Sequence, residues 1–164
     1  MADEKNEIKV RKMTGADLPK ANLVDSSLEG QRRVTTWPFS FENYWRIFEP
    51  SIAYCAELNG ELVGFIAGTI KEEERSHSLI SMTRNMGAAG NSAGKVGWIE
   101  IMGVHADRWG KGIGVALMTA FTDECKKQGV AMRINVSDDD DNLKNFLINQ
   151  KFETSETVTY GKTP

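Results

Sequence analysis

The sequence has few cysteines, no excess of positive charge and no long hydrophobic run. Cys55 and Cys125 are its 2 cysteines, too few for a disulfide framework or a Cys/His zinc site, so the reducing cytoplasm is the expected compartment. Lys and Arg number 20 against 23 Asp and Glu, a formal net charge of −3, which argues against nucleic acid as a partner because its binders usually carry a basic face. No stretch approaches the roughly 18 apolar residues of a membrane span, and the polar N-terminus lacks the apolar core of a signal peptide. We therefore expect a protein that binds neither nucleic acid nor membrane.

The chain does contain the apolar residues of a folded domain. Of its 164 residues, 40% are hydrophobic, with 4 Trp, 3 Tyr and 7 Phe, which is enough for one sizeable core. We expect a single domain over residues 1–164. Both cysteines lie in apolar segments, and we expect them to be core residues without a catalytic role.

The spacing of apolar residues predicts a mixed α/β domain. The clearest local signal is the Asn59-Gly60 dipeptide between two strand-like runs, because this pair accepts the type I′ turn of a β-hairpin. Ser40, with Asn43 behind it, is suited to cap a short helix that ends before Pro50. In order, the predicted elements are a strand 8–13, a helix 14–30, the short helix, strands 51–58 and 61–70, a long connection 71–95, a strand 96–105, a helix from 113 to about 128, a strand 131–137, a helix 138–150 and a strand 152–160.

Residues Arg108 to Gly114, "RWGKGIG", place three glycines and a lysine between a predicted strand and a predicted helix. Such a junction forms an anion site, because backbone N–H groups and the helix dipole point outward and glycine lets a phosphate approach the backbone. A Rossmann loop would need a glycine at Val115. The segment 90–96, "GNSAGKV", is one residue short of a Walker A loop and has Val96 where Ser or Thr must bind magnesium. The remaining readings are a phosphate site of another kind and a plain tight turn.

The segment Gly103 to Met118, "GVHADRWGKGIGVALM", resembles the acyl-CoA-binding motif of the GNAT superfamily of N-acetyltransferases. That motif reads [Q/R]-x-x-G-x-[G/A] after a strand that ends in L-x-V. Here 102–104, "MGV", takes the place of L-x-V, and Gly112 and Gly114 take the two small positions. The predicted element order agrees with the family over nearly the whole chain. The departure is Trp109, which stands where the family carries Gln or Arg.

The resemblance implies a fold, a co-substrate and its site. The fold would be α/β (α+β), a mixed, mostly antiparallel central sheet flanked by about four helices and splayed between the fourth and fifth strands. Acetyl-CoA would be the co-substrate, without a metal. Its pyrophosphate would lie on the amides of 109–114, and its pantetheine arm would pair with the exposed edge of 102–104. The implied cofactor-binding residues are Met102, Gly103, Val104, Arg108, Trp109, Gly110, Lys111, Gly112, Ile113, Gly114 and Asp140.

Glu100 is the candidate catalytic base. Acetyl transfer to an amine requires a base that takes a proton from the ammonium and donors that stabilise the oxyanion. Strand alternation would place Glu100 on the same face as Met102 and Val104, and in several members of the family an acid at this strand position deprotonates the amine. The alternative is a surface carboxylate on an amphipathic strand. By resemblance, the backbone N–H of Met102 or Gly103 would bind the oxyanion.

The general acid of the family has no clear counterpart. Many members carry N-x-x-A-x-x-x-Y-x-x-x-G-F, whose Tyr protonates the leaving thiolate. Alignment on the final Phe puts Asp140 at the Asn and Leu147 at the Tyr, whereas alignment on the chain's own Asn142 puts Asn149 there. Ser137 and Tyr160 are candidate substitutes. The thiolate can also leave without a side-chain acid, because a thiol pKa is about 8.5.

The segments that usually shape the acceptor pocket in this family correspond to 31–48, 71–95 and 153–161. The first contains aromatic residues, for which we favour core packing over a pocket wall: Trp37, Phe39, Tyr44 and Trp45. The acidic runs 72–74 and 138–141 would suit a cationic acceptor.

The predicted function is transfer of an acetyl group from acetyl-CoA to a primary amine by direct attack in a ternary complex. The acceptor would be a small-molecule or peptide amine, and a homodimer is a possible assembly. Two alternatives stay open: a non-catalytic acyl-CoA-binding regulatory module, which the missing Tyr favours, and a transferase of a different acyl group on the same fold.

Overall fold

The Asn59-Gly60 turn joins two inner strands of the sheet. Both residues have a positive φ, 53° and 83°, as a type I′ turn requires. They join β3 (Ile52–Leu58) to β4 (Glu61–Glu72), so the predicted hairpin is confirmed. This computed structural model describes residues 7–28, 34–35, 39–72, 94–137 and 140–154.

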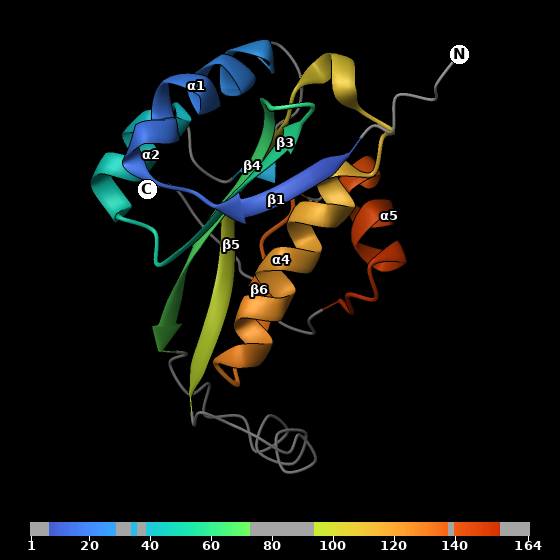
Figure 1. Ribbon diagram of the computed structural model, residues 1–164. Coiled ribbons are helices and arrows are strands. Elements are labelled where there is room, and N and C mark those ends of the chain that lie inside the picture. Colours follow the sequence, from blue (N-terminus) through green and yellow to red (C-terminus); the bar gives the residue numbers. More distant parts are fainter. Residues whose placement is uncertain (1–6, 29–33, 36–38, 73–93, 138–139, 155–164) are drawn as a thin grey trace, which may run out of the picture.

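The sheet is mixed and mostly antiparallel (Figure 1). Its order is β1 (Ile8–Lys12), β3, β4, β5 (Lys95–Val104) and β2 (Val34–Thr35), and β6 (Ala131–Ile134) pairs in parallel with β5. The β5–β6 pairing ends at Ile99 and Ile134. Beyond that point β2 pairs with Ile101 and Met102. The splay predicted between the fourth and fifth strands, here β5 and β6, is confirmed. The strand β2 is an addition that the sequence pattern does not predict.

Helices cover both faces of the sheet (Figure 1). On one face, here called the α1/α2 face, lie α1 (Leu18–Ser27), preceded by a 3-10 turn Gly15–Asp17, and α2 (Phe41–Phe48). The other, the α4/α5 face, carries α4 (Ile113–Lys127) and α5 (Asp141–Asn149). A second 3-10 turn, Ala106–Arg108, follows β5. These are the helices of the described part of the chain, and they agree with the predicted number.

The two faces bury separate hydrophobic cores. Cys55 lies in the core beneath α1 and α2, and Cys125 lies in the core beneath α4. Both thiols are free and buried, and burial raises the pKa of each to about 11. The expectation that the cysteines are core residues is therefore confirmed.

Helix boundaries follow local capping. The Ser40 Oγ accepts a hydrogen bond from the Asn43 N–H at 3.3 Å, which confirms the predicted cap of α2. The helix predicted over 14–30 is shorter, because α1 ends at Ser27. The predicted strand 152–160 and most of the connection 71–95 lie outside the described residues. None of the described helices is long and apolar enough to cross a membrane.

β5 contains a β-bulge at Glu100. Ala67 pairs with Ile101 and Gly68 pairs with Ile99, so Glu100 has no partner opposite it on β4. A Cβ at Gly68 would lie 1.9 Å from the Trp98 carbonyl oxygen, so the close approach of the two backbones requires glycine there.

The bulge changes the face to which Glu100 points. Its carboxylate bonds to Tyr44 of α2, and the next residue, Ile101, packs in the same α1/α2 core. Met102 packs on the opposite, α4/α5 face. The prediction that Glu100 shares a face with Met102 and Val104 is wrong, because the extra residue breaks the strict alternation of the strand.

Candidate functional site

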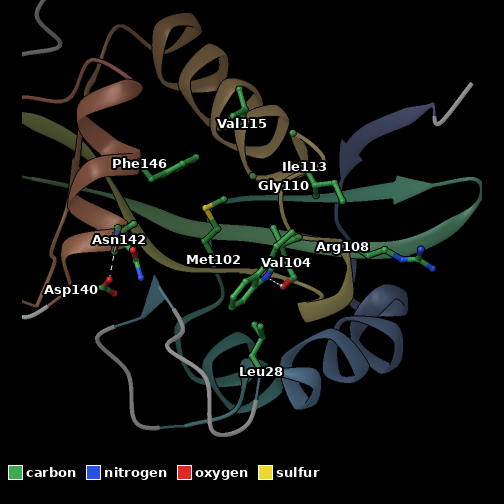
Figure 2. Close-up of a pocket in the computed structure, with 15 residues that line it drawn as sticks. Leu28, Met102, Val104, Arg108, Gly110, Ile113, Val115, Asp140, Asn142 and Phe146 are labelled. Atoms are coloured by element: carbon green, nitrogen blue, oxygen red, sulfur yellow. Dashed lines mark hydrogen bonds between the residues drawn. The ribbon is translucent and has the colours of Figure 1, made fainter.

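A cavity of about 640 Å³ opens where β5 ends and α4 begins (Figure 2). All the predicted cofactor-binding residues except Lys111 line it. The lining residues that the sequence did not point to are Leu28, Val115, Asn142, Leu143 and Phe146. In Figure 2, Phe146 from α5 points toward Met102 of β5, so these two side chains form one wall.

The loop between β5 and α4 supplies backbone donors to this cavity. Gly110 and Gly112 have φ of 76° and 79°, and an added Cβ at either would meet nothing within 4 Å. Gly112 is the N-cap of α4 and has no side chain with which to cap it. The N–H groups of the first helical residues, 113–115, have no partner within the helix. The loop therefore presents uncapped donors and the positive end of the helix dipole.

The two glycines of the motif are needed for different reasons. Gly112 adopts a left-handed backbone that L side chains rarely adopt. Gly114 lies inside α4, where an added Cβ would lie 3.2 Å from the Met102 Cε. Gly112 thus shapes the loop, and Gly114 lets α4 approach β5.

Neither charged side chain of the loop places its charged group at the centre of the cavity lining. The Arg108 Nη2 lies 3.5 Å from the Glu61 Oε2, and Figure 2 shows the guanidinium extending away from the other labelled side chains. Lys111 is exposed and is not among the lining residues. In the described part of the chain, no group of three or more His, Cys, Asp or Glu side chains is placed to hold a metal ion.

Trp109 and β2 occupy parts of the β5 edge. The Trp109 Nε1–H donates a hydrogen bond of 2.8 Å to the Val104 carbonyl, and Trp109 is 52% exposed. Met102 pairs with Val34 of β2. The prediction of an exposed edge over the whole of 102–104 is therefore wrong at Met102, because a strand of two residues has too little pattern to be predicted.

The helix α5 contributes a capping acid and no phenol. The Asp140 Oδ1 accepts a hydrogen bond of 3.1 Å from the Leu143 N–H and so caps α5, while Asp140 also lines the cavity. Leu147 is buried in the core, and Asn149 is exposed and not among the lining residues. Neither alignment register thus places a proton donor in the cavity. Tyr160 lies outside the described residues, and Ser137 is exposed and does not line the cavity.

Glu100 is a buried carboxylate with two partners. It is 8% exposed, which excludes the reading as a surface carboxylate. Its Oε2 accepts a hydrogen bond of 2.7 Å from the Tyr44 hydroxyl, and its Oε1 contacts the Lys71 ammonium. Burial and the hydrogen bond to Glu100 raise the pKa of the Tyr44 hydroxyl well above its usual value.

The partners of Glu100 could not be read from the sequence. Tyr44 is 56 residues away in the chain and Lys71 is 29 residues away. Tyr44 is fully buried and its ring stacks with those of Phe41 and Phe48. Tyr44 is therefore a core residue, as the sequence analysis favoured, and its hydroxyl also binds the Glu100 carboxylate.

The cavity reaches around the end of β5 toward the face of Glu100. Leu28, just after α1, lines the cavity, and an added Cβ at Gly103 would lie 3.0 Å from the Leu28 Cδ1. The cavity wall therefore includes residues from both faces of the sheet. Glu100 itself does not line the cavity.

Comparisons with known proteins agree with this arrangement. The family model described as the acetyltransferase (GNAT) family matches residues 22–148. A search of curated proteins by sequence found no match. Among solved structures, aminoglycoside N-acetyltransferase AAC(6')-Iy in complex with CoA is similar over 99% of this chain and 99% of that chain, with 15% identity and a TM-score of 0.71.

Two further structures share the fold. Aminoglycoside 6'-N-acetyltransferase AAC(6')-IG from Acinetobacter haemolyticus has 12% identity, a TM-score of 0.68 and coverage of 95% of this chain and 98% of that chain. Ribosomal-protein-alanine N-acetyltransferase from Brucella melitensis biovar Abortus 2308 has 16% identity, a TM-score of 0.63 and coverage of 96% and 99%. With the family match over residues 22–148 and the glycine loop at the N-terminus of α4, the chain belongs to the GNAT family of acetyltransferases.

Proposed function

We propose that this protein transfers the acetyl group of acetyl-CoA to a primary amine by direct attack in a ternary complex, with Glu100 as the general base. The observation that carries the proposal is the uncapped N-terminus of α4 beside the 640 Å³ cavity. A pyrophosphate fits this cradle, because the N–H groups of 113–115 lack helical partners and the two left-handed glycines leave open space in front of the backbone.

Glu100 has the surroundings of a base that is kept in one orientation. The Tyr44 hydroxyl holds one carboxylate oxygen, and the other is turned toward a cation. Gly103 lies three residues further along β5, roughly 10 Å in an extended strand. We propose that the acceptor amine, or a water bound to it, reaches Glu100 from the α1/α2 face.

The proposed transfer balances with the groups at hand. A proton moves from the acceptor ammonium to the Glu100 carboxylate, and the freed nitrogen forms a bond to the thioester carbon. The backbone N–H of Met102 or Gly103 would stabilise the oxyanion. The C–S bond then breaks, the amide nitrogen loses its second proton to water, and the leaving thiolate takes a proton from water, since none of the described residues that line the cavity is a phenol or a thiol.

A small cationic amine is the proposed acceptor. A buried carboxylate beside the site favours a positively charged group over a neutral one. Several similar structures are named aminoglycoside acetyltransferases, which supports a small-molecule amine, and one is named for a protein alanine. The free, buried cysteines support a reducing compartment such as the cytoplasm.

Ligand binding and turnover test the proposal in two steps. Acetyl-CoA and CoA should each raise the unfolding temperature, whereas NAD should not. At a ligand concentration 100 times the Kd, the free energy of unfolding should rise by about 2.7 kcal/mol. Thiol release should then follow with at least one member of an amine panel that contains neamine, spermidine, tyramine and a peptide with a free α-amino group. Stabilisation by NAD alone would contradict the acetyl-CoA site. Binding of CoA without turnover of any amine would favour a non-catalytic module.

A further inference from the structure

The proposed base already holds an ammonium group in this structure, that of Lys71. The Lys71 Nζ contacts the Glu100 Oε1. Among the ion pairs of the described residues, Glu100 pairs with Lys71 and with no other cation. A base that must receive a proton from an ammonium is thus paired with an ammonium supplied by its own chain.

We propose that Lys71 occupies the position of the acceptor's ammonium on Glu100, so that the acceptor must displace it and Lys71 sets the affinity for primary amines. This inference rests on the proposed function of Glu100 as the base. Lys71 would be a specificity-determining residue that acts through Glu100.

The register of the sheet brings the two residues together. Lys71 is the penultimate residue of β4 and pairs with Val96 of β5. Ile66 and Ile70 of β4 pack on the α4/α5 face, and Ala67 packs on the α1/α2 face. Because side chains alternate along a strand, Thr69 and Lys71 share the face of Ala67. Lys71 therefore projects from the α1/α2 face, the face to which the bulge turns Glu100.

The burial of the two side chains differs in the way that displacement requires. The Glu100 side chain is 6% exposed and that of Lys71 is 50% exposed. An unpaired carboxylate at such depth is unfavourable, so it needs a cation in every state in which it is ionised. Lys71 has a flexible stem and open solvent beside it, so its ammonium can leave at little cost.

Exchange of one ammonium for another conserves the charge at the site. The hydrogen bond from Tyr44 holds the other carboxylate oxygen throughout. A primary ammonium has the size and the donors of the group that it replaces, whereas a neutral amide or a quaternary ammonium lacks its charge or its N–H donors. The arrangement therefore selects an unhindered primary ammonium as the acceptor group.

Propylamine is a suitable probe, because it is a primary ammonium with a short chain. With the acetyl-CoA complex of Lys71→Ala, the KM for propylamine should fall about tenfold below that of the wild type, because the competing cation is absent. With Lys71→Arg it should rise, because a guanidinium pairs more tightly with a carboxylate. In both variants kcat should change much less than KM. Ligand-observed NMR with the CoA complex gives the same order of propylamine affinities without need of turnover.

Controls separate this inference from a structural role and from the proposed function. Lys127→Ala removes a lysine whose Nζ lies 4.0 Å from the Glu124 Oε2 on α4, and it should leave the KM for propylamine unchanged. Unchanged propylamine affinity in Lys71→Ala and Lys71→Arg, with a loss of thermal stability alone, would overturn the role of Lys71. If Glu100→Gln keeps full turnover, the proposed base fails. If Glu100→Gln loses turnover and the Lys71 variants keep the wild-type KM, the further inference alone fails.

Discussion

At the scale of single residues, two contacts determine how Glu100 is presented. The Tyr44 hydroxyl donates to one carboxylate oxygen and Lys71 contacts the other. The first contact is fully buried and the second reaches solvent. The carboxylate is therefore fixed on one side and open to exchange on the other.

Replacement of Glu100 by Gln removes the base and keeps the shape. We expect kcat for acetyl transfer to fall by roughly 10²–10⁴-fold, the usual contribution of a general base. The Kd for acetyl-CoA should stay unchanged, because Glu100 does not line the cavity. Thiol-release kinetics and calorimetric titration measure the two quantities. An unchanged kcat and pH profile would remove Glu100 from the mechanism.

Replacement of Tyr44 by Phe tests the fixed side of the carboxylate. Loss of a buried hydrogen bond to a charged group should lower the free energy of unfolding by about 1–3 kcal/mol. The kcat for the amine should fall as well, because Glu100 loses its orientation. Tyr54→Phe is the matched control, since the Tyr54 hydroxyl donates to Glu124 at 3.0 Å, away from Glu100. Denaturant unfolding and steady-state kinetics should show a stability loss in both variants and a kinetic loss in Tyr44→Phe only.

At the scale of elements, the sequence predicts what depends on local pattern. The hairpin at Asn59-Gly60, the cap at Ser40 and the long amphipathic helix α4 follow from turn chemistry and apolar spacing. The β-bulge does not, because one extra residue leaves no compositional trace and only the register with Gly68 shows it. The residues of the glycine loop other than Lys111 accordingly line the cavity, whereas the predicted face of Glu100 was wrong.

The junction between β5 and α4 makes a testable distinction between its glycines. Gly112→Ala should lower the free energy of unfolding by roughly 1–2 kcal/mol, because its φ of 79° is left-handed. Gly114→Ala should change it by less than about 1 kcal/mol, because the gain in helix propensity offsets the contact with the Met102 Cε. Both should weaken CoA binding in calorimetry, since both positions line the cavity. Equal stability losses would contradict the separate roles of the two glycines.

At the scale of the whole molecule, an ion-pair cluster ties the edge strand β1 to its neighbours in the fold. Arg11 of β1 donates to both carboxylate oxygens of Asp17, at 3.0 and 2.8 Å, and to Glu57 of β3. The guanidinium, with help from Thr14, holds the pKa of Asp17 well below its usual 3.8. The cluster links the first strand, the turn before α1 and the neighbouring strand.

This cluster predicts how stability depends on pH. Because the pKa of Asp17 is depressed by folding, its contribution is complete above pH 3.8, the usual value, and is lost as the pH falls through the lower, folded pKa. Asp17→Asn should therefore lower the free energy of unfolding by about 1–3 kcal/mol at pH 7, and the difference from the wild type should narrow below about pH 4. Urea unfolding of both proteins over this pH range measures the difference in the free energy of unfolding. Asp123→Asn, which removes an exposed ion pair with Lys126, should change the free energy of unfolding at pH 7 much less.

The indole of Trp109 gives the protein a built-in optical reporter. Trp109 is 52% exposed at the wall of the cavity, and its indole N–H donates to the Val104 carbonyl. A ligand that enters beside this carbonyl changes both the polarity around the indole and its hydrogen bond, and both alter tryptophan emission. Titration with CoA should therefore shift the fluorescence of the wild type, and Trp109→Phe should remove most of that shift while the other tryptophans stay in place. Unlabelled protein can thus report the filling of its own site in real time.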